Sequence, residues 1–177
     1  MRSTKRGVFV VVLLVLLFGG AMNVAAEVQV DIGINVPYYV GVRTDDDDID
    51  EAVRWVFVLP DVKVNWFDEV GPVRIGAGGR LWTLILQSVI YPIVSLEADV
   101  GRFVLNTNLG GGLFINFGLY TGMHFAGVFL PEFSAAYRMT DTFSLGTGAM
   151  FLFAPEVEDL SSFAYMGTVF GRFTIRP

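Results

Sequence analysis

The sequence predicts an all-β fold in which eight antiparallel strands form one up-and-down barrel. From Glu27 onward apolar and polar residues alternate, beginning with Val28, Val30 and Ile32. A period of two is typical of strands, because successive side chains point to opposite faces. The alternating segments are about 10 to 17 residues long and end in turn residues, as in sandwiches and barrels. The connections between them alternate in character: those after the even-numbered segments are tight turns, and two of the others are longer and acidic.

The first 26 residues differ from the rest and predict a cleavable signal peptide. Arg2, Lys5 and Arg6 precede an unbroken apolar run at residues 8–18. This run is shorter than the roughly 20 helical residues that span a bilayer, and the small residues ending at Ala26 suit cleavage before Glu27. An uncleaved membrane anchor is the alternative. The expected organisation is therefore a signal peptide at residues 1–26 and one barrel domain at residues 27–177.

The composition excludes several classes of protein. The net charge is −6, and loss of the signal peptide would leave nine Lys and Arg against 18 Asp and Glu. Such an acidic chain is not expected to bind nucleic acid. The absence of cysteine excludes a disulfide framework, a thiolate metal site, a catalytic thiol and a lipid-attachment cysteine. Beyond residue 26 no apolar stretch reaches 18 residues, so any membrane span would consist of strands.

Turn residues and alternation divide residues 27–177 into eight expected strands. They lie near residues 28–42, 53–67, 72–86, 89–101, 103–117, 122–138, 142–153 and 162–175. The connections at residues 68–71, 101–102 and 139–141 are tight, whereas those at 43–52 and 154–161 are longer and acidic. Short turns at one end, longer loops at the other and both termini beside the short turns fit a barrel with an even number of strands.

The second expected strand changes phase at Pro60. Before this proline the apolar residues are odd-numbered, as in Phe57, and after it they are even-numbered, as in Val62 and Val64. A shift of one residue exchanges the two faces of a strand, and proline cannot donate a ladder hydrogen bond. We therefore expect a β-bulge near Leu59–Pro60.

The polar face of the strands has the properties of a barrel interior. Glycine pairs recur on it, such as Gly110 and Gly112, and small residues make room in the narrow lumen of an eight-stranded barrel. Its charges also balance, as buried charges must, because an isolated one costs several kcal/mol. The expected lumen network consists of Asp31, Asp61, Glu97, Asp99 and Glu132 with Lys63, Arg74, Arg80, Arg138 and Arg172. The apolar face would then contact lipid.

Aromatic residues gather near both ends of the expected strands. Trp66, Phe67, Phe103, Tyr137, Phe143 and Phe173 lie beside the short turns, and Tyr38, Tyr39, Trp55, Trp82, Tyr91, Phe117, Tyr120, Phe151, Phe163 and Tyr165 lie toward the loops. Two aromatic girdles are typical of the two lipid interfaces of a membrane barrel.

With these features the chain resembles the small eight-stranded outer-membrane β-barrels of diderm, or Gram-negative, bacteria. The resemblance covers residues 27–177 and rests on the pattern of residues along the chain, without a specific motif. It implies a transmembrane barrel in the cell envelope, surrounded by outer-membrane lipid and assembled by the barrel-assembly machinery. That machinery commonly recognises a last strand ending in an aromatic residue, and here Phe173 is followed by four further residues.

An acidic surface loop is expected after the first strand. It contains Asp45, Asp46, Asp47, Asp48, Asp50 and Glu51. These oxygen ligands could bind Ca²⁺ or Mg²⁺ weakly, but the order of ligands and glycine in an EF-hand is absent. We expect a solvated loop, with no dedicated metal site and no cofactor.

The single histidine, His124, is the one candidate for catalysis. Barrel enzymes that modify lipid A need a histidine positioned by a carboxylate beside a serine nucleophile. His124 is expected on the inward face with Glu132 and Ser134, but Ser134 is ten residues away, about 33 Å along a strand. We expect no catalytic residues.

The sequence thus favours a non-enzymatic integral outer-membrane protein with a structural or surface-interaction role. The alternatives are a narrow pore or conduit for small solutes, a lipid A-modifying enzyme, and a soluble lipocalin-like periplasmic binder.

Overall fold

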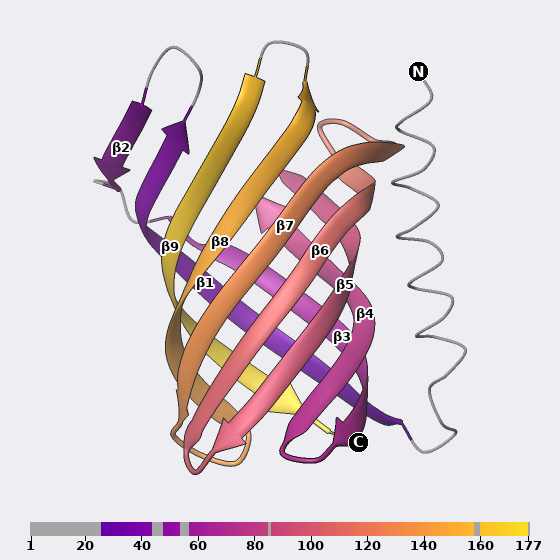
Figure 1. The fold of residues 1–177 in the computed structure, drawn as a ribbon, viewed down its shortest axis with the longest axis vertical. Coiled ribbons are helices and arrows are strands. Elements are labelled where there is room, and N and C mark those ends of the chain that lie inside the picture. Colours follow the sequence, from indigo (N-terminus) through magenta and orange to yellow (C-terminus); the bar gives the residue numbers. More distant parts are fainter. Residues whose placement is uncertain (1–25, 44–47, 54–56, 85, 158–159, 177) are drawn as a thin grey trace.

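A computed structural model describes residues 26–43, 48–53, 57–84, 86–157 and 160–176. Eight long strands form a closed antiparallel barrel, and a ninth, short strand extends one hairpin (Figure 1). The strands are β1 (Glu27–Arg43), β2 (Asp48–Ala52), β3 (Leu59–Val70), β4 (Val73–Leu84), β5 (Gln87–Val100), β6 (Phe103–Gly118), β7 (Gly122–Arg138), β8 (Phe143–Val157) and β9 (Leu160–Ile175). The predicted signal peptide lies outside the described residues except for Ala26. None of the described residues forms a helix long and apolar enough to cross a membrane.

The barrel closes between its first and last strands. The strand order is β1-β3-β4-β5-β6-β7-β8-β9, and β9 pairs with β1 from Val30↔Ile175 to Arg43↔Phe163. Each of the eight long strands therefore has a hydrogen-bonded neighbour on both sides. The predicted fold, an eight-stranded antiparallel barrel, is confirmed.

Tight turns join the strands at one end of the barrel. Gly71 and Gly101 begin the β3–β4 and β5–β6 turns with φ angles of 65° and 64°. A positive φ at the first central residue suits a two-residue hairpin turn, and Pro72, with its φ fixed near −65°, fits the second position of a type II′ turn. Both ends of the described chain lie beside these turns (Figure 1).

The two predicted acidic loops are shorter than expected. β2 occupies residues that the sequence predicts as loop, and it pairs with Tyr39–Arg43 of β1. This part of β1 extends beyond its last pair with β3, Asn35↔Leu59, so its backbone edge is free to accept β2. Likewise, β8 continues to Val157 and β9 starts at Leu160. Backbone pairing outweighs the low strand propensity of acidic residues, because propensity depends strongly on context.

The predicted bulge at Leu59–Pro60 is wrong. Pro60 pairs with Ile34 in a ladder that has no register shift. The phase change in the sequence instead marks the start of β3 at Leu59, and the first residues of a strand are where proline is tolerated. In the part of the chain that the structure describes, register shifts occur between Pro37 and Tyr39, Ile90 and Ile93, Gly111 and Leu113, and Ala154 and Val157.

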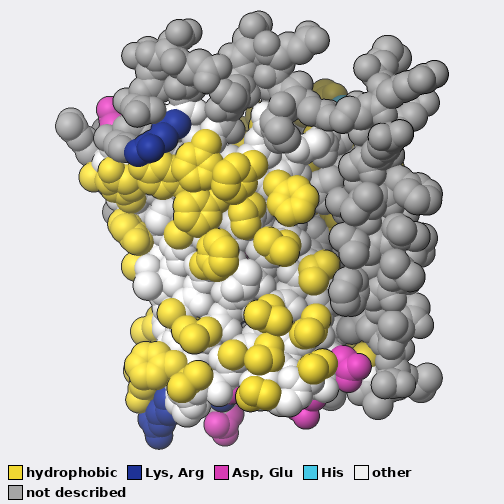
Figure 2. Space-filling model, viewed as in Figure 1, with side chains coloured by type: hydrophobic (Ala, Val, Ile, Leu, Met, Phe, Trp, Pro, Cys, Tyr) yellow, Lys and Arg dark blue, Asp and Glu magenta, His cyan; other side chains and the backbone are white. Residues whose placement is uncertain are grey.

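The two faces of the wall are sorted as the sequence predicts. Lys63 and Arg80 point into the barrel and are each 1% exposed, whereas Ile34 and Phe133 on the outside are each 52% exposed. Figure 2 shows apolar side chains covering the visible wall, with charged side chains near its two ends. The barrel is therefore inverted relative to a water-soluble one: its interior is polar and its surface is apolar.

Glycines on the inner face accommodate buried aromatic rings. A Cβ added to Gly110 would lie 2.6 Å from the Tyr91 ring, and one added to Gly146 would lie 2.6 Å from the Phe170 ring. Gly76 lies against Phe67 in the same way, at 2.7 Å. Because these distances are shorter than carbon–carbon contacts allow, the glycines are needed for the rings to fit.

Substitution of Gly110 tests this packing. Gly110→Ala should destabilise the barrel by about 1–3 kcal/mol, because the methyl group overpacks the lumen against Tyr91. The control is Gly79→Ala: the nearest atom to an added Cβ there is 3.9 Å away, so we expect a neutral change or a stabilisation of about 0.4–1 kcal/mol. Urea unfolding in lipid vesicles measures both variants. Equal effects would contradict the packing argument.

Candidate functional site in the barrel lumen

A charged cluster crosses the middle of the lumen. The guanidinium of Arg80 on β4 donates from Nε to Asp61 Oδ2 at 3.0 Å, and its Nη2 lies 2.9 Å from the same oxygen. Its Nη1 donates to Glu132 on β7. Lys63 Nζ lies 3.4 Å from Glu132 Oε2. Two cations thus share two carboxylates, and the cluster connects β3 and β4 with β7 across the barrel.

Neutral side chains complete the hydrogen bonding of these carboxylates. Asn35 Nδ2 donates to Asp61 Oδ1 at 2.8 Å, and Asn108 Nδ2 donates to Glu132 Oε2 at 3.3 Å. Ser95 Oγ in turn donates to Asn108 Oδ1 at 2.7 Å. Such additional donors are necessary because a buried ion pair repays its loss of hydration only when its remaining hydrogen-bonding groups are satisfied.

A second cluster lies near the short turns and is centred on Gln29. Gln29 Nε2 donates to Asp31 Oδ2 at 3.1 Å, and its Oε1 accepts from Arg74 Nη2 at 3.0 Å and from Arg176 Nε at 3.1 Å. Arg74 also pairs with Glu97, and Arg176 Nη2 lies 3.6 Å from Glu97 Oε1. The cluster therefore connects both ends of the described chain to β4 and β5.

The ten residues expected in the lumen network do not form one group. The middle cluster contains Asp61, Lys63, Arg80 and Glu132, and the second cluster, near the short turns, contains Asp31, Arg74 and Glu97. Asp99 and Arg138 form a separate pair at the rim, with Arg138 Nη2 2.9 Å from Asp99 Oδ1 and the Asp99 side chain 42% exposed. Arg172 is buried without a carboxylate partner among the described residues.

Three arginines in the lumen stack on aromatic rings. The sequence predicts two of these rings, Phe67 and Trp82, in the outer girdles. Arg74 lies 5.0 Å from the centroid of Phe67, Arg80 4.6 Å from Trp82 and Arg172 4.5 Å from Phe170. These distances are within the range of cation–π attraction. The prediction that Phe67, Trp82 and Tyr91 belong to the outer girdles is wrong, because all three are buried in the lumen. Strict alternation could have placed them there: Phe67 shares the parity of Lys63, and Trp82 shares that of Arg80.

An apolar layer lies in the lumen on the loop side of the charged cluster. It consists of Leu59, Trp82, Tyr91 and Ile93, all of which are buried. The ring of Phe114 packs against that of Tyr91, with 5.8 Å between centroids. From the short turns to the loops, the described side chains of the lumen therefore change from the polar cluster around Gln29 to the charged cluster and then to this apolar layer.

Aromatic contacts on the outer wall are concentrated toward the loops. The rings of Phe151 and Phe163 lie 5.7 Å apart, those of Phe153 and Phe163 4.9 Å apart, and those of Tyr39 and Tyr165 6.0 Å apart. At the short-turn end, Phe143 packs on Phe173 and Phe103 on Tyr137, with centroid distances of 4.8 and 5.3 Å. These side chains form two aromatic zones, as expected for the girdles; Trp55 lies outside the described residues.

His124 lies near the loop end of β7, where its side chain is exposed and stacks on Tyr120 with 5.4 Å between ring centroids. It pairs in the ladder with Phe114, so it lies far along β7 from Glu132 and Ser134. Of the acidic loop, Asp45, Asp46 and Asp47 lie outside the described residues, whereas Asp48, Asp50 and Glu51 belong to β2. Within the described ranges, no group of three His, Cys, Asp or Glu residues is close enough to hold a metal ion.

Comparisons with known proteins support the fold. No protein-family model matches the chain, and a search of curated proteins finds no match. The crystal structure of Neisserial surface protein A matches with a TM-score of 0.50 and 9% identity, over 82% of this chain and 96% of that one. The attachment invasion locus protein of Yersinia pestis matches more weakly, with a TM-score of 0.44 and 10% identity over 85% of this chain and 99% of that one. The N-terminal β-barrel domain of Pseudomonas aeruginosa OprF matches with a TM-score of 0.45 and 9% identity over 82% of this chain and 97% of that one. The first match confirms, at the level of the fold, the predicted resemblance to small eight-stranded outer-membrane barrels.

Removal of Arg80 tests the middle cluster. Arg80→Leu should destabilise the barrel by about 3–5 kcal/mol, because Asp61 and Glu132 lose a shared buried cation. Adding Asp61→Asn should recover part of this loss, since Lys63 still neutralises Glu132. Arg102→Leu at an exposed turn is the control and should have little effect. Denaturant unfolding of the refolded proteins measures all four chains; a double variant less stable than Arg80→Leu would contradict the charge argument.

Proposed function

We propose that this protein is an integral outer-membrane β-barrel protein with a structural or surface-interaction role and no enzymatic activity. The observation that carries the proposal is the inverted burial of the barrel. Ionised side chains are enclosed, while large apolar side chains such as Ile34, Leu96 and Phe133 are exposed around the wall. Contiguous exposed apolar surface on this scale is not expected of a soluble monomer. A bilayer would cover it.

The same observation argues against a soluble lipocalin-like binder. In such a protein the apolar faces of the strands would line the interior and contact the ligand. Here the interior contains Lys63, Arg80, Glu97 and Glu132, all of them nearly inaccessible to solvent. Closure of the ladder between β1 and β9 also fits a bilayer, because hydrocarbon offers no hydrogen bonds to a free strand edge.

The filled lumen favours a structural protein over a pore. The charged cluster and the apolar layer of Leu59, Trp82, Tyr91 and Ile93 lie next to each other in the barrel interior, where Arg80 is the ladder partner of Tyr91. Below them, a cavity at the short-turn end has a volume of about 30 Å³, which is room for roughly two water molecules. A solute would have to displace these buried side chains to pass.

The placement of His124 argues against lipid A chemistry. Nucleophilic catalysis needs a histidine within hydrogen-bonding distance of the serine and a carboxylate that orients it. Ser134 lies ten residues further along the same strand, about 33 Å away by the rise of a strand. The contact that the structure gives His124 is the ring of Tyr120.

Two neighbouring loops at the loop end could supply an interaction surface. Gln87 Nε2 donates to the carbonyl of Tyr120 at 2.9 Å, and the Tyr120 backbone N–H donates to Gln87 Oε1 at 3.0 Å. Leu119 N–H also donates to the Leu86 carbonyl at 3.3 Å. These bonds hold the β4–β5 and β6–β7 loops together, and Leu86, Leu119 and Tyr120 are exposed there.

The other partners that we propose are outer-membrane lipid and, during biogenesis, the barrel-assembly machinery. We propose only weak binding of divalent cations by the acidic residues near β2.

Membrane placement is tested by charges at two depths of the outer wall. Leu109, midway along β6, is 45% exposed, and Val100, beside the β5–β6 turn, is 59% exposed. In a bilayer, Leu109→Arg should destabilise the barrel by about 2–4 kcal/mol and Val100→Arg by about 0–1 kcal/mol, since the cost of a charge depends on its depth. Unfolding from lipid vesicles measures both, and the wild-type protein should fractionate with membranes. Equal small effects, or recovery in the aqueous fraction without detergent, would contradict the proposal.

A closed lumen predicts no conductance. Purified protein in planar bilayers should show no single-channel steps, because the apolar layer and the charged cluster block the path. The double substitution Trp82→Ala and Tyr91→Ala removes two large side chains of the apolar layer and is the matched positive control for an opened lumen. Regular conductance steps in the wild-type protein would favour the narrow pore.

A further inference from the structure

Arg102 is a cation on the outer side of the barrel rim. It lies in the β5–β6 turn, is exposed, and takes part in no ion pair with the described residues. Its Nη1 donates to the hydroxyl of Tyr137 at 3.5 Å. Tyr137 belongs to the outer face of β7, where its ring packs against that of Phe103 with 5.3 Å between centroids. The Arg102 guanidinium therefore lies over the outer wall at the short-turn end.

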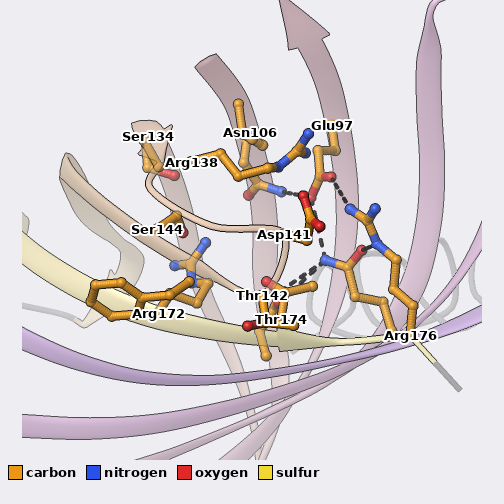
Figure 3. Close-up of a pocket in the computed structure, with 15 residues that line it drawn as sticks. Glu97, Asn106, Ser134, Arg138, Asp141, Thr142, Ser144, Arg172, Thr174 and Arg176 are labelled. Carbon is orange, nitrogen blue, oxygen red and sulfur yellow. Dashed lines mark hydrogen bonds and ion pairs between the residues drawn. The ribbon is translucent and has the colours of Figure 1, made fainter. Parts of the chain in front are cut away.

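The acidic side chains near this part of the rim are on the lumen side. Figure 3 shows Arg138 and Asp141 among the side chains that line the lumen cavity. Arg138 Nη2 also lies 2.9 Å from Asp99 Oδ1, so the charge of Asp99 is already compensated. On the lipid side, Arg102 therefore offers a positive charge that an anionic headgroup can neutralise. Arginine suits this role because its guanidinium donors match the oxygens of a phosphate group.

A groove in the outer wall lies next to Tyr137, on the side toward the middle of the barrel. Its volume is about 490 Å³, within the range of about 300–1,000 Å³ for small-molecule sites. The groove crosses β6, β7 and β8, and its lining includes small side chains between larger ones: Ala135, Thr147 and Ala149 between Leu105, Phe133 and Tyr38. On the visible wall, Figure 2 shows fewer apolar side chains at mid-height than above or below.

The groove can accept hydrocarbon along a path that starts at the cation. Thr147 Oγ1 donates to the carbonyl of Thr168 at 2.9 Å, so its methyl group is left to contact the groove. Ala135 precedes Tyr137 by two residues on β7, which is about 7 Å along a strand. A lipid whose headgroup lies at Arg102 can therefore place an acyl chain in the groove.

We propose that the outer wall binds one anionic phospholipid from the leaflet beside the short turns. This rests on the membrane placement proposed above. The Arg102 guanidinium and the Tyr137 hydroxyl donate to the phosphate of the headgroup, and one acyl chain lies in the groove between Phe133 and Tyr38. The cation selects the charge of the headgroup, and the groove selects a molecule with a hydrocarbon chain.

A neighbouring groove has no such cation and provides an internal comparison. It lies on the outer faces of β1, β8 and β9, has a volume of about 800 Å³, and includes Leu145 and Gly171 in its lining. The cation at this end of β9 is Arg176, which lies 3.6 Å from Glu97 and 3.8 Å from Glu27. Because Arg176 is engaged by these carboxylates, we expect this groove to accept hydrocarbon without selecting a headgroup.

Headgroup selection is tested by native mass spectrometry of the protein in detergent micelles. The micelles contain equimolar phosphatidylglycerol and phosphatidylcholine with identical acyl chains. One phosphatidylglycerol should be retained with a preference of about fivefold, which is what one interfacial arginine provides. Arg102→Gln should abolish the preference, and Arg43→Gln, which removes an exposed arginine at the loop end, should keep it. Equal retention of both lipids by the wild-type protein, or a preference that survives Arg102→Gln, would overturn the proposal.

The groove is tested by filling it. Ala149→Leu should cause loss of the bound lipid, and the fold should tolerate it because Ala149 pairs with the exposed Phe133 on the outer wall. Gly171→Leu fills the neighbouring groove and is the matched control. It should retain the lipid, since an added Cβ there lies 3.5 Å from its nearest atom. Displacement of the lipid by soluble glycerol phosphate, or a protein dimer that Ala149→Leu abolishes, would overturn the proposal in favour of a headgroup-only site or a second copy of the chain.

Failure of this lipid site is separable from failure of the membrane placement. A protein that fractionates with membranes but retains both lipids equally contradicts the lipid site alone. Recovery of the protein in the aqueous fraction without detergent contradicts the membrane placement, and the lipid site with it.

Discussion

The rest of the structure depends on ion pairs that cross the lumen. Arg80 on β4 and Lys63 on β3 both reach Glu132 on β7, on the far side of the barrel. Because the wall exposes its apolar side chains, it cannot hold the barrel together by burying them in a common core. Backbone hydrogen bonds connect neighbouring strands, and the charged cluster connects opposite ones. The interior must therefore remain charged and balanced for the surface to be apolar.

In this lumen, aromatic rings stabilise arginine side chains that water would hydrate at an exposed position. Each of Arg74, Arg80 and Arg172 places its guanidinium over a buried ring, and glycines such as Gly76 and Gly146 leave space for those rings. Cation–π attraction is stronger where water is excluded. The glycines, rings and arginines therefore form one packing unit, in which the smallest side chains make room for the largest.

Most of the fold could be predicted because alternation is strict where one face meets a different medium from the other. The strands containing Lys63 and Arg80 show it throughout, and their faces follow from the sequence. Two features could not be predicted in this way. β2 forms because β1 extends beyond its last pair with β3. This depends on the pairing of the strands and not on the acidic segment itself. The position of Arg172 beside a cavity arises only when four strands converge.

Pairing of β1 with β9 brings together the two most distant parts of the described chain, as in the pair between Val30 and Ile175. Contacts so far apart in sequence are slow to form, because the entropy of closing the intervening chain must be lost before they can stabilise anything. The β1–β9 pairing should consequently be the last part of the barrel to form. Until it does, the first and last strands each display an unsatisfied backbone edge, and the nascent chain needs shelter from self-association at that stage.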